Sequence, residues 1–250
     1  MKQENIIKVN PNEDAGIKKG RQLIRGMKTG ISIAVGYIPI AITFGLLSKA
    51  AGVPNAISIM MSLVVYAGAS QFVAVNLLAL HTGYWEILLT TFILNFRHFL
   101  MGASISQRIE KGLSKPWMAL LAFGITDETF AVASMEKEQQ LNPWFLLGLN
   151  LIAFSAWNAG TWAGVFLGTA LPDSVQSSMG IALYAMFIGL LVPAAREKKA
   201  IFHIAMLAVL LHGILHWTPG LEVISTGWKI VITTILASTA GALIYTEEAL

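Results

Sequence analysis

Three polar residues that could do chemistry lie inside one long apolar run of the sequence. Residues 94–106 read LNFRHFLMGASIS and contain Asn95, Arg97 and His98. A charged side chain at the centre of a bilayer costs about 2.5 kcal/mol or more, so it is a candidate functional residue by default. Arg97 therefore needs an acid, backbone carbonyls or an anionic ligand. The alternative is a segment end that bends toward the cytoplasm beside Arg108.

A possible counter-charge to Arg97 lies in a second stretch, FGITDETFAVAS. Asp127 and Glu128 are the only acids of segment 116–135. Adjacent residues lie about 100° apart on a helix, so at most one of the two faces an interior cavity fully. Buried carboxylates and histidines can take up and release protons. Asp127, Glu128 and His98 are therefore the predicted proton-coupling residues.

A third stretch, YAGASQFVAV at 66–75, carries Gly68, Ala69, Ser70 and Gln71 in the middle of an apolar run. Small residues let a helix leave its regular geometry. They also line tight helix contacts in membranes, so packing is the alternative interpretation. A long amide in an apolar environment needs hydrogen-bond partners, which favours a binding site around Gln71. We expect the helix to break here.

Two further segments combine aromatic residues with a helix breaker or a polar group. GYIPIAITFG holds Pro39, which removes a backbone hydrogen bond and frees a carbonyl. FSAWNAGTWAG holds Trp157 and Asn158. Ligand binding and simple packing are both open for the aromatic residues. The predicted substrate-binding set is Tyr37, Pro39, Phe44, Gly68, Ala69, Ser70, Gln71, Phe72, Asn95, Arg97, Trp157 and Asn158.

Catalysis and metal binding have weaker support. Ser70 follows Gly68 in a GxS pattern with His98 as a conceivable base, but the glycine expected after a nucleophilic serine is missing. This argues against an intramembrane serine hydrolase. His212 and His216 share a helix face but lack a third ligand, which favours interfacial histidines. We predict a protein that is not an enzyme, with no metal site and no cofactor.

The elements that must position these residues are membrane helices. Of the 250 residues, 55 % are hydrophobic and only 12 % are charged, and the mean hydropathy is +0.65. A soluble domain is about a quarter charged, and a helix needs about 20 apolar residues to cross a bilayer core. The sequence therefore predicts an all-α polytopic membrane protein. Its seven to eight apolar segments lie at about 31–50, 55–80, 85–107, 116–135, 143–170, 174–194, 200–217 and 228–246.

The distribution of basic residues predicts the orientation of these segments. Seven of the 17 basic residues lie in the first 28 positions, and others gather at 108–115 and 196–199. By the positive-inside rule these three regions face the cytoplasm, so the net charge of +3 indicates topology and not a nucleic-acid partner. Eight simple crossings would place 108–115 outside. The conflict disappears if the first two segments make one net crossing, one of them being broken or re-entrant.

A weak internal similarity suggests a repeat. A shift of 118 residues superposes Pro54 on Pro172 and His98 on His216. Together with the charges, this favours an inverted-topology repeat with interrupted helices, as in many secondary transporters. Eight ordinary helices with one violation of the charge rule are the alternative. The predicted organisation is a basic cytoplasmic segment 1–28, a first repeat with a linking helix 29–135, and a second repeat with a last helix 143–250.

Four ordered blocks of sequence resemble one known family. GYIPIAITFG, YAGASQFVAV, LNFRHFLMGASIS and GITDETFAVAS, with a weaker AFSAWNAGTWAG, are similar to the large, AzlC-type subunit of branched-chain amino acid exporters. The resemblance implies a permease of the cell inner membrane that exports leucine, isoleucine and valine, with methionine as a further candidate. It also implies proton coupling and a small AzlD-type membrane subunit as partner. A passive channel for a small solute is the alternative function.

Overall fold

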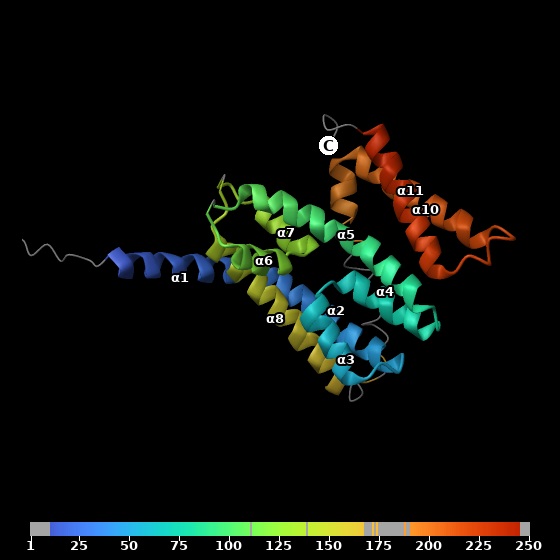
Figure 1. Cartoon of the computed structure of the whole chain (residues 1–250), viewed down its shortest axis with the longest axis horizontal. Helices are drawn as coiled ribbons and strands as arrows, with labels where there is room; N and C mark the ends of the chain where they lie inside the picture. Colours follow the sequence, from blue (N-terminus) through green and yellow to red (C-terminus); the bar gives the residue numbers. More distant parts are fainter. Residues whose placement is uncertain are drawn as a thin grey trace, which may run out of the picture. The chain divides into compact units, whose positions relative to one another are not determined.

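The computed structural model describes residues 11–110, 112–138, 140–167 and 191–245, together with positions 172, 174 and 188. This part of the chain is helical and contains no β-strand, which confirms the predicted all-α class (Figure 1). In chain order the elements are α1 (Pro11–Thr29), α2 (Ile31–Ala50), α3 (Asn55–Met60), the π-helix η1 (Met61–Val65), α4 (Gly68–Ala79), α5 (Tyr84–Arg108), α6 (Lys115–Phe123), α7 (Asp127–Ser134), α8 (Pro143–Leu167), α10 (Lys199–Trp217) and α11 (Thr226–Ile244). Among these described helices, α2, α5, α10 and α11 are long and apolar enough to cross a membrane.

The chain divides into two compact units. Unit 1 comprises Met1–Tyr37 and His98–Trp157, and unit 2 comprises Ile38–Arg97 and Asn158–Leu250. The units interleave along the sequence, so that α2, α5 and α8 each contribute residues to both. The predicted site residues consequently fall into two sets, one in each unit.

Glycines bring α8 into direct backbone contact with α1 and α2. In unit 1, a Cβ atom added to Gly26 would lie 2.0 Å from the carbonyl oxygen of Phe145, and one added to Gly30 would lie 2.5 Å from Ile152. Positions that increase from Gly26 at the end of α1 to Gly30 just after it therefore meet positions that increase along α8, so this stretch runs parallel to α8. Small residues that let backbones approach closely are typical of helix contacts in membranes.

The same parallel packing occurs in unit 2. A Cβ atom on Gly160 would lie 2.8 Å from the carbonyl oxygen of Ile38, and one on Gly164 would lie 2.2 Å from that of Ile42. Under the 118-residue shift, α2 and α8 are equivalent segments, and an inverted repeat requires equivalent helices to run in opposite directions. The observed direction therefore does not support an inverted pairing of α2 with α8, and the repeat itself stays a prediction. Most of the predicted segment 174–194 lies outside the described residues.

The apolar segment 55–80 is broken in the middle of YAGASQFVAV, as predicted. The π-helix η1 ends at Tyr66, which has left-handed backbone angles of φ 47° and ψ 43°, and α4 begins at Gly68. Gln71 Nε2 donates to Ser62 Oγ at 2.9 Å, so the chain bends at the break enough to bring the two sides together. Neither half approaches the length of about 20 residues that a full crossing needs.

A second break divides the predicted segment 116–135, and the sequence analysis missed it. Helix α6 ends at Phe123, α7 begins at Asp127, and residues 124–126 between them are not helical. Helix α7 has only eight residues. Its first turn carries the two acids predicted to act in proton coupling, so this break positions a candidate site in unit 1.

Two arginines hold the chain that follows α7. Arg25 on α1 donates to the carboxylates of Glu136 and Glu138. Arg108, at the end of α5, donates to four backbone carbonyl oxygens at 2.8 to 3.2 Å, those of Ala133, Ser134, Glu136 and Glu138. The C-terminal end of α7 is therefore fixed within unit 1 by charged hydrogen bonds.

Replacing Arg108 by glutamine is expected to loosen this connection. Hydrogen bonds from charged groups contribute about 1.5 kcal/mol or more each, and about 1.4 kcal/mol corresponds to a tenfold change in an equilibrium. Amide hydrogen exchange across residues 134–138 should therefore accelerate by about tenfold or more. The matched control is Arg196→Gln, which changes an exposed arginine outside this connection. Equal exchange in the Arg108 variant and the wild type would contradict the assigned role.

Candidate functional site

Residues from three distant stretches meet around Tyr37 in unit 1. The Tyr37 side chain is almost fully buried, and its hydroxyl donates to the carboxylate of Glu128 and lies 2.7 Å from Thr126 Oγ1. Its ring packs edge-on against Trp157, with centroids 5.3 Å apart and an interplanar angle of 77°. The structure therefore brings together three predicted site residues, Tyr37, Glu128 and Trp157, and adds Thr126, which was not predicted.

A reciprocal cap at the start of α7 fixes the position of Glu128. The Thr129 backbone N–H donates to Thr126 Oγ1 at 3.3 Å, and the Thr126 N–H donates to Thr129 Oγ1 at 2.8 Å. Asp127 and Glu128 therefore occupy the first turn, where the helix dipole favours negative charge. Of these two half-buried acids, Glu128 contacts Tyr37.

Asn150 on α8 supports the break between α6 and α7. Its side chain is buried, and Nδ2 donates to the carbonyl oxygen of Leu121 at 2.9 Å, which satisfies one of the free carbonyls at the end of α6. A Cβ atom on Gly124 would lie 2.5 Å from Asn150 Nδ2, so the amide packs directly on the break. Sequence analysis missed this residue, although an amide within the apolar run LGLNLIAF was a usable signal.

A chain of buried hydrogen bonds crosses the other break, in unit 2. Ser62 and Thr161 have their hydroxyl oxygens 2.8 Å apart, and Gln71 Nε2 donates to Ser62 Oγ at 2.9 Å. All three residues are at most 1 % exposed. Gln71 thus has the partners that its amide requires in an apolar environment. Gly68 and Ala69 are half-buried in the first turn of α4.

Four more predicted residues form two pairs in unit 2. Ser70 Oγ donates to Asn95 Oδ1 at 2.5 Å, which joins α4 to α5. Phe44 and Phe72 pack edge-on with their centroids 5.6 Å apart. The serine that a hydrolase would use as nucleophile is therefore bonded to an amide oxygen, a group that cannot act as a general base.

The remaining predicted residues are placed individually. Pro39 lies inside α2, which stays helical on both sides, and its carbonyl oxygen accepts from Thr43 Oγ1 at 2.9 Å. Asn158 lines a pocket of about 510 Å³ between α8 and the α3–η1 helix. Arg97 and His98 are half-buried on α5, and their roles in charge pairing and proton transfer stay predictions.

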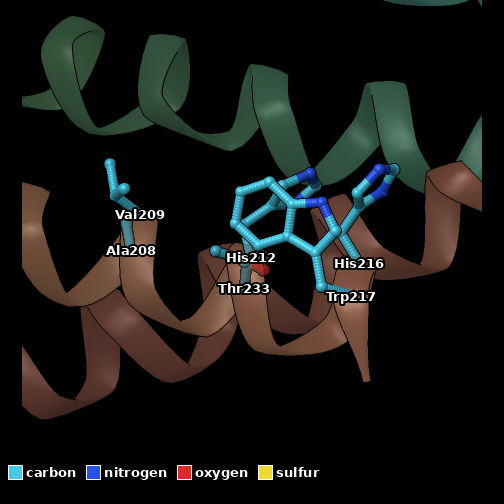
Figure 2. A pocket seen from close by; sticks show the side chains of 7 residues that line it. Ala208, Val209, His212, His216, Trp217 and Thr233 are labelled. Atoms are coloured by element: carbon cyan, nitrogen blue, oxygen red, sulfur yellow. The ribbon is translucent and has the colours of Figure 1, made fainter. Parts of the chain in front are cut away.

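The histidine pair lines a separate pocket of about 580 Å³ between α10 and α11 (Figure 2). The rings of His212 and His216 are stacked with centroids 6.3 Å apart, and Trp217 and Thr233 complete the wall. Within the described part of the chain, no three His, Cys, Asp or Glu side chains are grouped so as to hold a metal ion. The interfacial interpretation of the two histidines stays a prediction.

The fold and these clusters define a class: an all-α membrane protein whose polar side chains gather at interrupted helices, an arrangement typical of secondary transporters. The chain belongs to the AzlC family, because residues 32–171 match the family model described as AzlC protein.

Curated relatives agree with this assignment. The chain is 34 % identical over 197 residues to the inner membrane protein YgaZ of Escherichia coli, covering 76 % of the chain and 80 % of that protein. It is 36 % identical over 188 residues to a membrane protein of Archaeoglobus fulgidus, covering 73 % and 80 %. It is 27 % identical over 177 residues to the branched-chain amino acid transport protein AzlC of Bacillus subtilis, covering 68 % and 66 %. No solved structure matches the chain.

Proposed function

We propose that this protein is a secondary transporter that exports leucine, isoleucine and valine, with methionine as a further candidate. It acts in the inner membrane with its N-terminus in the cytoplasm, as the large subunit of a two-component exporter with a small AzlD-type partner. Family membership supports the proposal, as does the name of the Bacillus subtilis relative, a branched-chain amino acid transport protein. The structural observation that carries it is the contact of the buried Tyr37 with Glu128 and Trp157.

The cluster in unit 1 offers what a branched-chain amino acid and a proton need. Glu128 lies beside the break at 124–126. Its carboxylate accepts a hydrogen bond from the Tyr37 hydroxyl. Protonation of Glu128 weakens that acceptor, which couples proton uptake to the geometry around Tyr37. In this proposal the rings of Tyr37 and Trp157, which pack edge-on, supply the apolar contact for an aliphatic side chain. In this proposal Glu128 carries the proton.

Leucine efflux tests the proposed function. Cells that express the protein together with the small membrane subunit are loaded with a leucine-containing dipeptide, and external leucine is measured over time. Efflux against a leucine gradient that a protonophore abolishes is expected, and cells with either subunit alone are the controls. Efflux that only dissipates a gradient would favour the passive channel, and absence of efflux for all branched-chain amino acids would overturn the proposal.

The polar residues at the break in unit 2 should differ in their effects. Ser70→Ala removes a single hydroxyl and is expected to change leucine transport by about fivefold or less, because a neutral hydrogen bond contributes only about 1 kcal/mol. Gln71→Leu leaves Ser62 without its buried amide partner and should reduce transport about tenfold. Transport assays in inverted vesicles measure both. Equal effects of the two variants would contradict a shaping role for the Gln71 network.

A further inference from the structure

Asn150 carries a buried acceptor atom that none of the described residues satisfies. The residue is only 4 % exposed, and Oδ1 has no hydrogen-bond partner among the described residues. The orientation of the amide is fixed because Nδ2 donates to the Leu121 carbonyl at 2.9 Å. The group left over is therefore an oxygen. Buried polar atoms are nearly always paired, so this oxygen needs a donor that the described residues do not supply.

The surroundings of this oxygen favour a positively charged donor. Asn150 packs on Gly124, and the same break leads within four residues to the carboxylate of Glu128. The Tyr37 hydroxyl proton is directed to that carboxylate. The break therefore combines a negative charge with an unsatisfied acceptor, in a segment with no basic side chain between Lys115 and Lys137. A cation that donates several hydrogen bonds suits both groups.

We infer that Asn150 Oδ1 binds a primary ammonium group, the α-ammonium of the transported amino acid, which Glu128 attracts by its charge. This rests on the proposed function and adds a specificity residue to it. Asn150 and Trp157 are seven residues apart on α8, about two helical turns, and so lie on the same helix face. An amino acid held by its ammonium at Asn150 can direct its aliphatic side chain along that face.

Three ligands distinguish the contribution of the ammonium group to binding from that of the rest of leucine. Leucine has both charged groups, 3-methylbutylamine lacks the carboxylate, and 4-methylpentanoate lacks the ammonium. Each is titrated against the purified full-length protein in lipid nanodiscs, and the thermal unfolding midpoint gives its apparent Kd. Asn150→Leu, which keeps the volume and removes the acceptor, should weaken leucine and 3-methylbutylamine about tenfold. Binding of 4-methylpentanoate should not change.

A matched control separates loss of this acceptor from loss of any buried polar atom. Thr233 Oγ1 is also buried without a partner among the described residues, but it lies in unit 2 on α11. Thr233→Val should leave all three affinities unchanged. If Asn150→Leu does not fold, Asn150→Asp keeps the acceptor oxygens and should retain binding of 3-methylbutylamine.

Several results would overturn the inference. Equal weakening of all three ligands by Asn150→Leu would mean that the amide only supports the break, and unchanged affinities would exclude any contact. Stabilisation by sodium chloride that disappears in Asn150→Leu, without an effect on the amine, would assign the site to a metal cation. A folded Asn150→Asp protein that does not bind the amine would also contradict it. If the wild type binds 3-methylbutylamine but no branched-chain amino acid, the proposed function fails while the ammonium site stands.

Discussion

Replacing Glu128 by glutamine is expected to reduce proton-driven leucine export by about a hundredfold. Glutamine keeps the size of the side chain but cannot take up a proton, and it turns the charged hydrogen bond from Tyr37 into a neutral one. Hydrogen bonds to charged groups contribute about 1.5–3 kcal/mol, which corresponds to roughly 10- to 100-fold. Tyr37→Phe removes the donor alone and should cause a loss of about tenfold. Leucine uptake into inverted vesicles with an imposed proton gradient measures both.

Two other acids give this experiment its controls. Glu138→Gln changes an acid that pairs with Arg25, away from the Tyr37 cluster, and should leave transport near the wild-type rate. Asp127→Asn changes the adjacent acid in the same helical turn. If Asp127→Asn abolishes transport while Glu128→Gln transports normally, the proton is carried by Asp127 and the assignment to Glu128 is wrong.

Substituting valine at Gly164 is expected to cause a large loss of stability. A Cβ atom there would lie 2.2 Å from the carbonyl oxygen of Ile42, a backbone atom that cannot rotate away as a side chain does. Overpacking a well-packed contact usually costs about 1–3 kcal/mol, and a clash with backbone belongs at or above the upper end. The free energy of unfolding in detergent, followed by denaturant titration, should fall accordingly.

A second glycine provides the control for this change. Gly36 lies on α2, and a Cβ atom added there has no neighbour within 4 Å. Gly36→Val should therefore leave the free energy of unfolding within about 1 kcal/mol of the wild type. An equal loss in both variants would show that the destabilisation comes from valine in a helix and not from the contact between α2 and α8.

Local sequence signals predicted one of the two breaks. Gly68, Ala69 and Ser70 interrupt an apolar run, and the helix does end and restart beside them. The break at 124–126 was missed because its residues, GIT, are nearly as apolar as their neighbours. The signal present was Thr126 followed by two acids, a pattern typical of a helix N-terminus. The two acids were interpreted only as candidate proton-coupling residues, although together with Thr126 they also mark the start of α7.

The grouping of the site residues could not be predicted from the sequence. Each of Tyr37, Glu128 and Trp157 was a candidate because of its residue type. In the sequence they are about 90 and 30 residues apart, and only the packing of α2, α7 and α8 brings them into contact. The same limit applies to the predicted repeat. A few identities at a shift of 118 residues carry no information on helix direction, whereas the glycine contacts determine it.

The glycine contacts also limit how this protein can move. In several places a glycine of one helix faces a carbonyl oxygen of its neighbour. If one helix slid along the other by one residue, a larger side chain would be driven into that carbonyl. In unit 1 this makes the pair of α1 and α8 a fixed frame. Helix α7 is held differently, since it is short, follows the non-helical residues 124–126 and has its C-terminal end fixed by hydrogen bonds from Arg108. A change in the contact of Glu128 with Tyr37 would therefore have to come from bending at 124–126 while the frame stays still.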